Sequence, residues 1–198
     1  MSATRTFVII GHDAPTTGDF SLDDLPGAGR LDLLCRCLGA SFLRSHGIRE
    51  NGRVDLVLSE TFVLRFEGAT LRRLNPDERS TAALIRNALD QREEAIGRMA
   101  VETSPGVFLS RGDTAWVLEE VSGEIIHLHE DGTPAADLEP PENPVFVLSD
   151  HQDFAPDEMQ TLSDVATARV CLGPEALHAD QAITVAHNWL DTAGFTRY

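Results

Sequence analysis

Short, mostly apolar runs recur along the chain, and each of them stops at a polar or glycine residue. They cover residues 6–10, 54–58, 124–128, 144–148 and 168–172. Runs of this length that lack a regular polar alternation are typical of strands buried on both faces of a parallel sheet. We therefore expect these five segments to be the buried strands of one sheet.

Between these runs, apolar residues follow the i, i+3, i+4 spacing of helices. Three segments with this spacing are residues 31–42, 156–166 and 178–193. A further helix is expected to begin with Asn75 as its N-cap and Pro76 at its first helical position. Strands that alternate with helices predict an α/β fold with a mainly parallel sheet.

Other stretches have a weaker pattern. Residues 61–66 alternate towards a turn, and residues 70–73 are expected to return as the second arm of a hairpin. Within residues 101–123 we expect only a short helix, at residues 115–121. Residues 131–143 are rich in proline and acids and are expected to be a connection.

In an open α/β sheet, ligands bind in the crevice beyond the carboxyl ends of the strands. The loops that start at Leu128, Ser149 and Leu172 each follow one of the expected strands. We expect these loops to converge, and we place the active site where they meet.

The charge of the chain is strongly negative but unevenly placed. There is no lysine, and 16 arginines against 32 acidic residues give a net charge of −16. This composition resembles that of proteins from salt-accumulating organisms, in which a negative surface keeps the protein dissolved. Thirteen of the 16 arginines lie in residues 1–100. A polyanionic partner therefore remains compatible with the sequence, because arginine binds phosphate through a bidentate fork.

No apolar run reaches the length of a membrane span, and the first residues lack a basic flank and a cleavage site. We therefore expect a cytoplasmic protein without a membrane partner. The three cysteines, Cys35, Cys37 and Cys171, are an odd number and do not have the spacing of a disulfide framework or a zinc site.

Several long motifs, in a fixed order, resemble one family. They read RTFVIIGHDAPTTGDFSLDDLPGAGRLDLLCRC, LRRLNPDERSTAALIR, IHLHEDG, VFVLSDHQDF and LGPEALHADQAITVAHNWLDTAG. The chain resembles the haloarchaeal type of the TrmY family, archaeal tRNA pseudouridine(54) N1-methyltransferases of the SPOUT superfamily. The resemblance implies a single SPOUT methyltransferase domain over residues 1–198, with a C-terminal trefoil knot, a homodimeric assembly and S-adenosylmethionine (AdoMet) bound by the knot loops.

The resemblance also implies which residues bind AdoMet. Carried over by position, they are Leu128, Ser149, Asp150, Leu172, Gly173, Pro174, Glu175, Ala176, Leu177 and Ala182. The family often has Gly where Ser149 stands and Cys where Ala182 stands, so these two positions depart from its pattern.

Methylation at N1 of pseudouridine requires that the N1 proton be removed as the methyl group is transferred. Asp13 and Asp150 directly follow strand ends, and we take them as candidate proton acceptors or relays. In the alternative interpretation, Asp13 braces its loop and Asp150 caps the following helix. His12 and His151 are further possible relays.

The arginines near two helix starts are candidates for RNA contact. They are Arg30, Arg36, Arg72, Arg73 and Arg79. Gly27 to Gly29, next to Arg30, suggest a phosphate cradle. Alternatively, Arg72, Arg73 and Arg79 form a solvated face paired with Asp77 and Glu78.

His127 and His129 lie on one side of an expected strand, and with Glu130 and Asp131 they suggest a metal site. Partial exposure at a strand end explains them more simply, so no metal is expected.

The leading hypothesis is therefore AdoMet-dependent methylation of pseudouridine 54 in the T loop of tRNA, with tRNA as the partner. One alternative is the same reaction on ribosomal RNA. Another is a non-catalytic RNA-binding or assembly protein without a working cofactor pocket.

Overall fold

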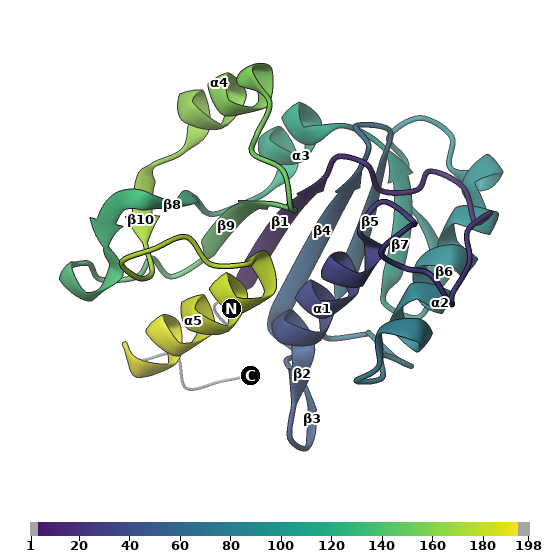
Figure 1. Cartoon of the computed structure of the whole chain (residues 1–198), viewed down its shortest axis with the longest axis horizontal. Coiled ribbons are helices and arrows are strands. Elements are labelled where there is room, and N and C mark those ends of the chain that lie inside the picture. The colour runs from purple at the N-terminus through teal and green to yellow at the C-terminus, as the bar shows by residue number, and fades with distance from the viewer. Residues whose placement is uncertain (1–3, 194–198) are drawn as a thin grey trace.

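The computed structural model describes residues 4–193, which form an eight-stranded sheet with helices on both faces (Figure 1). In chain order, the elements are β1 (Arg5–Gly11), α1 (Leu31–Phe42), β2 (Leu43–Arg44), β3 (Gly47–Ile48), β4 (Gly52–Leu58), β5 (Phe62–Glu67), α2 (Glu78–Asp90), the 3-10 helix η1 (Arg92–Glu94), β6 (Val101–Ser104), β7 (Val107–Arg111), α3 (Thr114–Glu120), β8 (Glu124–Pro134), the 3-10 helix η2 (Ala135–Asp137), β9 (Pro144–Ser149), α4 (Pro156–Val165), β10 (Ala168–Cys171) and α5 (Ala179–Thr192). Within residues 4–193, no helix combines the length and the apolar character needed to cross a membrane.

The strand order across the sheet is β10-β8-β9-β1-β4-β5-β7-β6. The strands from β10 to β4 pair in parallel, and β5, β7 and β6 extend the sheet by antiparallel pairing. The first strand of the chain, β1, lies in the middle of the sheet between β9 and β4. The prediction of a mainly parallel α/β sheet is confirmed, and all five apolar runs are strands of its parallel part.

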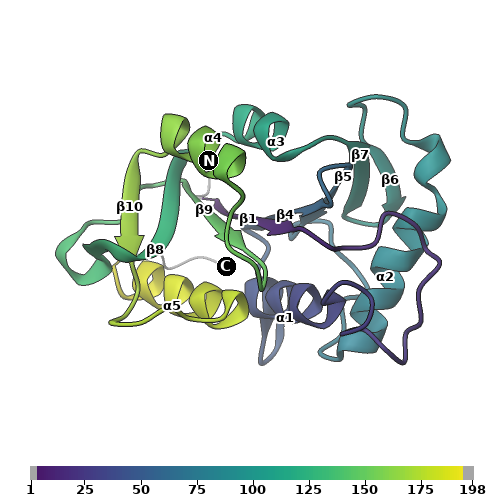
Figure 2. The same cartoon turned by 45° about the horizontal axis from the view of Figure 1, so that its top comes forward.

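The two faces of the sheet have separate cores because side chains alternate along each strand. On β1, Phe7 and Ile9 pack towards α1, α2 and α5, whereas Val8 and Ile10 pack towards α3 and α4. Figure 2 shows α1, α2 and α5 on one face of the sheet and α3 and α4 on the opposite face. The crevice at the carboxyl ends of the parallel strands therefore lies between two helical layers.

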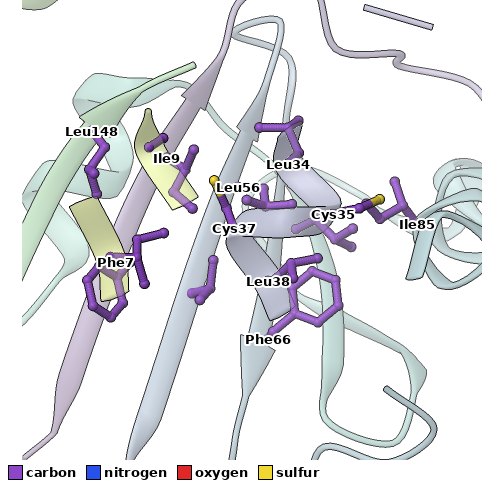
Figure 3. Close-up of a cluster of buried hydrophobic side chains, with 14 of the residues drawn as sticks. Phe7, Ile9, Leu34, Cys35, Cys37, Leu38, Leu56, Phe66, Ile85 and Leu148 are labelled. Atoms are coloured by element: carbon purple, nitrogen blue, oxygen red, sulfur yellow. The ribbon is translucent and has the colours of Figure 1, made fainter. Parts of the chain in front are cut away.

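The core beneath α1 includes two cysteines (Figure 3). Cys35 lies near Ile85 of α2, whereas Cys37 lies near the sheet residues Ile9 and Leu56. Both cysteines are buried and free. Burial raises the pKa of Cys35 to about 12 and also raises the pKa of Cys37 well above its ordinary value. These thiols are packing groups and not nucleophiles.

The hairpin expected at residues 70–73 is wrong. After β5 the backbone N–H of Leu71 donates to the carbonyl of Glu67, and the buried Leu71 side chain anchors a turn towards α2. β5 pairs in antiparallel fashion with β4 on one side and with β7 on the other, and β7 forms a hairpin with β6 within the stretch where we expected only a helix. That helix is confirmed as α3.

The start of α2 also differs from the prediction. The N-cap is Asp77, whose side chain accepts the backbone N–H of Ser80 at 2.8 Å. Asn75 and Pro76 lie in the preceding turn. An aspartate two residues further on supplied an equally good cap, so the prediction failed by two residues.

Strand β8 continues through residues expected to be a connection. Its end pairs with β10 after a register shift between Arg169 and Val170, so that Val170 lies opposite Thr133. Gly132 makes this pairing possible, because a Cβ at this position would lie 2.5 Å from the backbone carbon of Val170. Residues 131–134 therefore extend the pairing with the edge strand β10 beside the expected active site.

Candidate functional site

A cavity of about 460 Å³ lies at the carboxyl ends of β8, β9 and β10, where the three loops were expected to converge. This volume is within the range of small-molecule sites. Nine of the ten residues assigned to the cofactor by resemblance line it: Leu128, Ser149, Asp150, Leu172, Gly173, Glu175, Ala176, Leu177 and Ala182. Pro174 does not line the cavity and is exposed.

The walls of the cavity combine apolar side chains with acids. Its apolar part comes from three strands and two helices, and includes Leu148, Phe154 and Met159 beside the expected leucines. The acids are Glu130, Asp150, Asp153 and Glu175. Apolar surfaces suit the adenine ring of AdoMet, and carboxylates favour its sulfonium and ammonium charges. The chemistry of the lining therefore fits this cofactor.

A buried polar atom also faces this region. His127 is 5% exposed, and its Nε2 atom has no hydrogen-bond partner within residues 4–193. Burial, with the charge of Arg169 and the neighbouring His129, lowers the pKa of His127 to about 4. A neutral imidazole with a free ring nitrogen offers a ligand one hydrogen bond without repelling a sulfonium.

The two histidines that suggested a metal site contact each other. The rings of His127 and His129 meet edge to face, with centroids 5.4 Å apart. Within residues 4–193, no three His, Cys, Asp or Glu side chains are grouped so that they could hold a metal ion.

Asp150 lies at the wall of the cavity, and its side chain is 1% exposed. Its carboxylate accepts the backbone N–H groups of His12 and Gln152, each at 2.9 Å, and lies 2.9 Å from His12 Nδ1. The alternative that Asp150 caps the next helix is wrong, because α4 begins after Ala155 and Glu158 accepts the Ala155 N–H.

Asp13 has a different environment. It is exposed and accepts one hydrogen bond, from Gln152 Nε2 at 2.6 Å. Its backbone carbonyl packs against Gly29, where a Cβ would lie only 1.8 Å away. Gly29, with a φ of +62°, therefore closes the long loop onto Asp13. The loop after β1 thus holds Asp13 beside the loop after β9.

The expected phosphate cradle at Gly27 to Gly29 already has an internal acceptor. The carboxylate of Asp24 accepts the backbone N–H of Gly27 at 3.1 Å. A carboxylate oxygen thus holds the position that a phosphate oxygen would take.

His12 connects Asp150 to a residue that the sequence analysis did not single out, Glu158 of α4. The Nε2 atom of His12 lies 2.9 Å from Glu158 Oε2, and the Glu158 side chain is 7% exposed. A sequence signal existed, because a glutamate at the third helical position often reaches back to the N-cap backbone. Its contact with His12, 146 residues away, had no such signal.

The five candidate RNA-binding arginines differ in their surroundings. Arg30 and Arg36 both bind Asp32, and Arg36 also contacts Glu78 and Asp180. Asp180 lies in the first turn of α5, next to Ala179 of the cavity wall. These two arginines are therefore on the side of the cofactor cavity.

The other three arginines lie further along the chain, and Arg79 directly follows Glu78, a partner of Arg36. Arg79 pairs with Asp23 rather than with its neighbours Asp77 and Glu78. Arg72 donates its backbone N–H to Pro105, at the turn between β6 and β7. Arg73 is exposed and has a φ of +65°. Arg72 and Arg73 are thus placed with the β6–β7 turn and not with the cavity.

Comparison with known proteins agrees with this geometry. Residues 4–195 match the family described as "Putative SAM-dependent RNA methyltransferase". The tRNA (pseudouridine(54)-N(1))-methyltransferases of Haloferax volcanii and Haloarcula marismortui are 61% and 62% identical to the chain, and each match covers 98% of this chain and 100% of the relative. The enzyme of the same name from Methanococcoides burtonii is 41% identical, over 94% of this chain and 96% of its own.

Among solved structures, the chain is similar to Archaeoglobus fulgidus Nep1 bound to S-adenosylhomocysteine. The TM-score is 0.66 at 13% sequence identity, and the match covers 98% of this chain and 99% of that one. This likeness concerns the fold. The sequence matches over almost the whole length show that the chain belongs to the SAM-dependent RNA methyltransferase family.

Proposed function

We propose that this protein transfers the methyl group of AdoMet to N1 of pseudouridine at position 54, in the T loop of tRNA. The observation that carries the proposal is the cavity at the ends of β8, β9 and β10, whose lining fits AdoMet. The choice of tRNA pseudouridine 54 as the methyl acceptor rests on the names of the relatives that match over their full length.

The chain's own residues position the cofactor. Leu128, Leu172 and Leu177 would pack against the adenine ring, and Ala182 lines the cavity from α5. The loop after β10 would offer backbone groups to the edge of the ring. When bound, AdoMet supplies an electrophilic methyl group, and the acids of the cavity wall stabilise its positive charge.

Of the two candidate proton acceptors, Asp13 suits the role better. As the N1–methyl bond forms, the N1 proton must pass to a base, and a base needs an accessible lone pair within hydrogen-bond reach. Asp13 is exposed and has one partner, whereas the Asp150 carboxylate is buried and already accepts three hydrogen bonds from His12 and Gln152. We assign proton acceptance to Asp13 and shaping of the cofactor loop to Asp150.

The proposal includes three features of the whole assembly. These are a trefoil knot in the C-terminal part of a single domain, a homodimer and a cytoplasmic location. The return of the chain from the edge strand β10 to α5, which packs beside α1 on the face opposite α4, supports the knot (Figure 1). Of the candidate arginines, we assign RNA contact near the reacting base to Arg30 and Arg36, because they share Asp32 and Arg36 contacts Asp180 beside the cavity wall.

The test is methylation of two matched tRNAs, with pseudouridine or uridine at position 54, by labelled AdoMet in high potassium chloride. We expect label only on the pseudouridine tRNA. A ribosomal RNA fragment with pseudouridine serves as a third acceptor, and label on that fragment alone would contradict the assignment to tRNA. Binding of tRNA without AdoMet binding would favour the non-catalytic alternative.

A further inference from the structure

His12 has a carboxylate on each of its two ring nitrogens. Nδ1 lies 2.9 Å from Asp150 Oδ1, and Nε2 lies 2.9 Å from Glu158 Oε2. A neutral imidazole carries one N–H and can donate to only one of these oxygens. Both carboxylates also accept backbone N–H groups, as ionised carboxylates do. The geometry therefore requires an imidazolium between two carboxylates.

This contact joins three segments that are far apart in the sequence. His12 follows β1, Asp150 opens the loop after β9, and Glu158 lies in the first turn of α4. Between these two acids, residues 149–155 carry a large part of the cavity wall, including Ser149, Gln152, Asp153 and Phe154. Both ends of this loop are fixed by one imidazolium.

We infer that His12 is a positioning residue whose imidazolium holds the loop of residues 149–155 in the shape that binds AdoMet. This inference deepens the proposed function and rests on it. His12 does not line the cavity, so it acts through Asp150 and Glu158. One proton on His12 thereby controls the form of the cofactor site.

The charges around His12 agree with this role. Burial alone would lower the pKa of His12, but the hydrogen bonds and charges of Asp150 and Glu158 outweigh it and leave the pKa above its ordinary 6.5. The other charged groups here are His151, whose Nδ1 lies 3.5 Å from Asp150 Oδ2, and Arg30, which acts on Asp150 from a longer distance. The contact is complete below pH 6.5 and is lost as the pH rises through the raised pKa.

The test is AdoMet binding by calorimetry, without RNA, from about pH 6 to about pH 9 in high potassium chloride. We expect the affinity of the wild type to fall towards high pH. In Glu158→Gln the side-chain oxygen still accepts from the Ala155 N–H, but one of the two charges that raise the His12 pKa is gone. The loss of affinity should then occur at lower pH.

His12→Gln should bind AdoMet about tenfold more weakly near pH 6.5 and lose most of the pH dependence, because glutamine is uncharged and its single amide nitrogen cannot replace both ring nitrogens. His46→Gln, in the exposed turn between β2 and β3, is the matched control and should behave as the wild type. S-adenosylhomocysteine, which lacks the sulfonium charge, should lose affinity in parallel with AdoMet. A change for AdoMet alone would show a charge effect and overturn the positioning role.

An unchanged pH profile in both variants would also overturn the inference. If His12→Gln does not fold, Glu158→Gln and NMR titration of the His12 ring in the wild type decide the question, since a ring that titrates at or below 6.5 contradicts it. Because binding is measured without RNA, a failure of methylation with normal, pH-dependent binding would refute the proposed function and leave His12 as inferred.

Discussion

At the scale of single residues, two aspartates that follow neighbouring strands have different surroundings. Asp150 is enclosed and holds His12 and Gln152, whereas Asp13 reaches solvent with a single donor, Gln152. A proton on the Asp150 carboxylate would remove the charge that strengthens its three hydrogen bonds. The geometry therefore separates a structural carboxylate from a reactive one.

Asp13→Asn should lower kcat about a hundredfold or more, because an amide cannot accept the N1 proton, and should leave the dissociation constant of AdoMet unchanged. Asp150→Asn should instead weaken AdoMet binding. Both carboxylate oxygens accept hydrogen bonds from His12 or Gln152, and an amide NH₂ in place of one oxygen cannot accept any. Single-turnover methylation and calorimetry separate the two effects. Asp19→Asn, an exposed acid of the same loop, is the control. Equal kcat values for Asp13→Asn and the wild type would contradict the role of Asp13 as the proton acceptor.

At the scale of elements, α5 is fastened to β1 and α1 by polar contacts under its apolar face. The buried Arg5 lies 2.6 Å from Asp191, and its Nη1 donates to His187 Nδ1 at 3.1 Å. His187 Nε2 in turn donates to the carbonyl of Ser41 at 3.1 Å. Burial, with the charges of Arg49 and Arg5, lowers the pKa of His187 to about 3. The helix that closes the cavity floor therefore depends on a neutral histidine.

The folded chain should lose stability in acid for this reason. His187 takes up a proton near pH 6.5 in the unfolded chain but not in the folded one, so its contribution is present above 6.5 and is lost as the pH falls. From about pH 7.5 to about pH 5, this loss amounts to about 2 kcal/mol. Urea unfolding of His187→Gln should show a pH dependence smaller by that amount, with His46→Gln as control. An identical slope in His187→Gln and wild type would contradict the assignment.

The strands that could be predicted are those in which consecutive residues are apolar because they are buried. The runs at β1, β4 and β9 are mostly apolar because both faces of these strands are covered. Strand β6 is a half-exposed edge strand and has no such run. The loops around the cavity could be placed from strand ends alone. The contact of His12 with Glu158 could not, because it depends on how α4 docks.

At the scale of the whole molecule, arginines and acids are organised into shared pairs. Within residues 4–193, three aspartates each hold two arginines: Asp32 holds Arg30 and Arg36, Asp55 holds Arg53 and Arg65, and Asp191 holds Arg5 and Arg49. Asp55 thereby joins β4 to β5, and Asp191 joins α5 to β1. Over the whole sequence, the excess of acids leaves a net charge of −16. Unpaired acids at the surface repel one another, and this repulsion opposes folding.

The free energy of unfolding should therefore rise with potassium chloride. Between about 0.2 M and about 3 M salt, the screening length falls from about 7 Å to below 3 Å, which removes repulsion between surface acids but affects the buried pairs little. Urea midpoints followed by tryptophan fluorescence measure this change. A midpoint that stays constant or falls with salt would mean that ion pairs, and not repulsion, dominate the electrostatics of the fold.

The position of β1 in the middle of the sheet has a consequence for synthesis of the chain on the ribosome. The first strand to emerge needs β9 as a neighbour, and the cavity needs the loop after β10 and the helix α5, which emerge last. A nascent or prematurely terminated chain can hold Asp13 and the arginines of the first half, yet it has no place for the cofactor. Premature termination upstream of residue 172 should therefore yield inactive chains and no partly active enzyme.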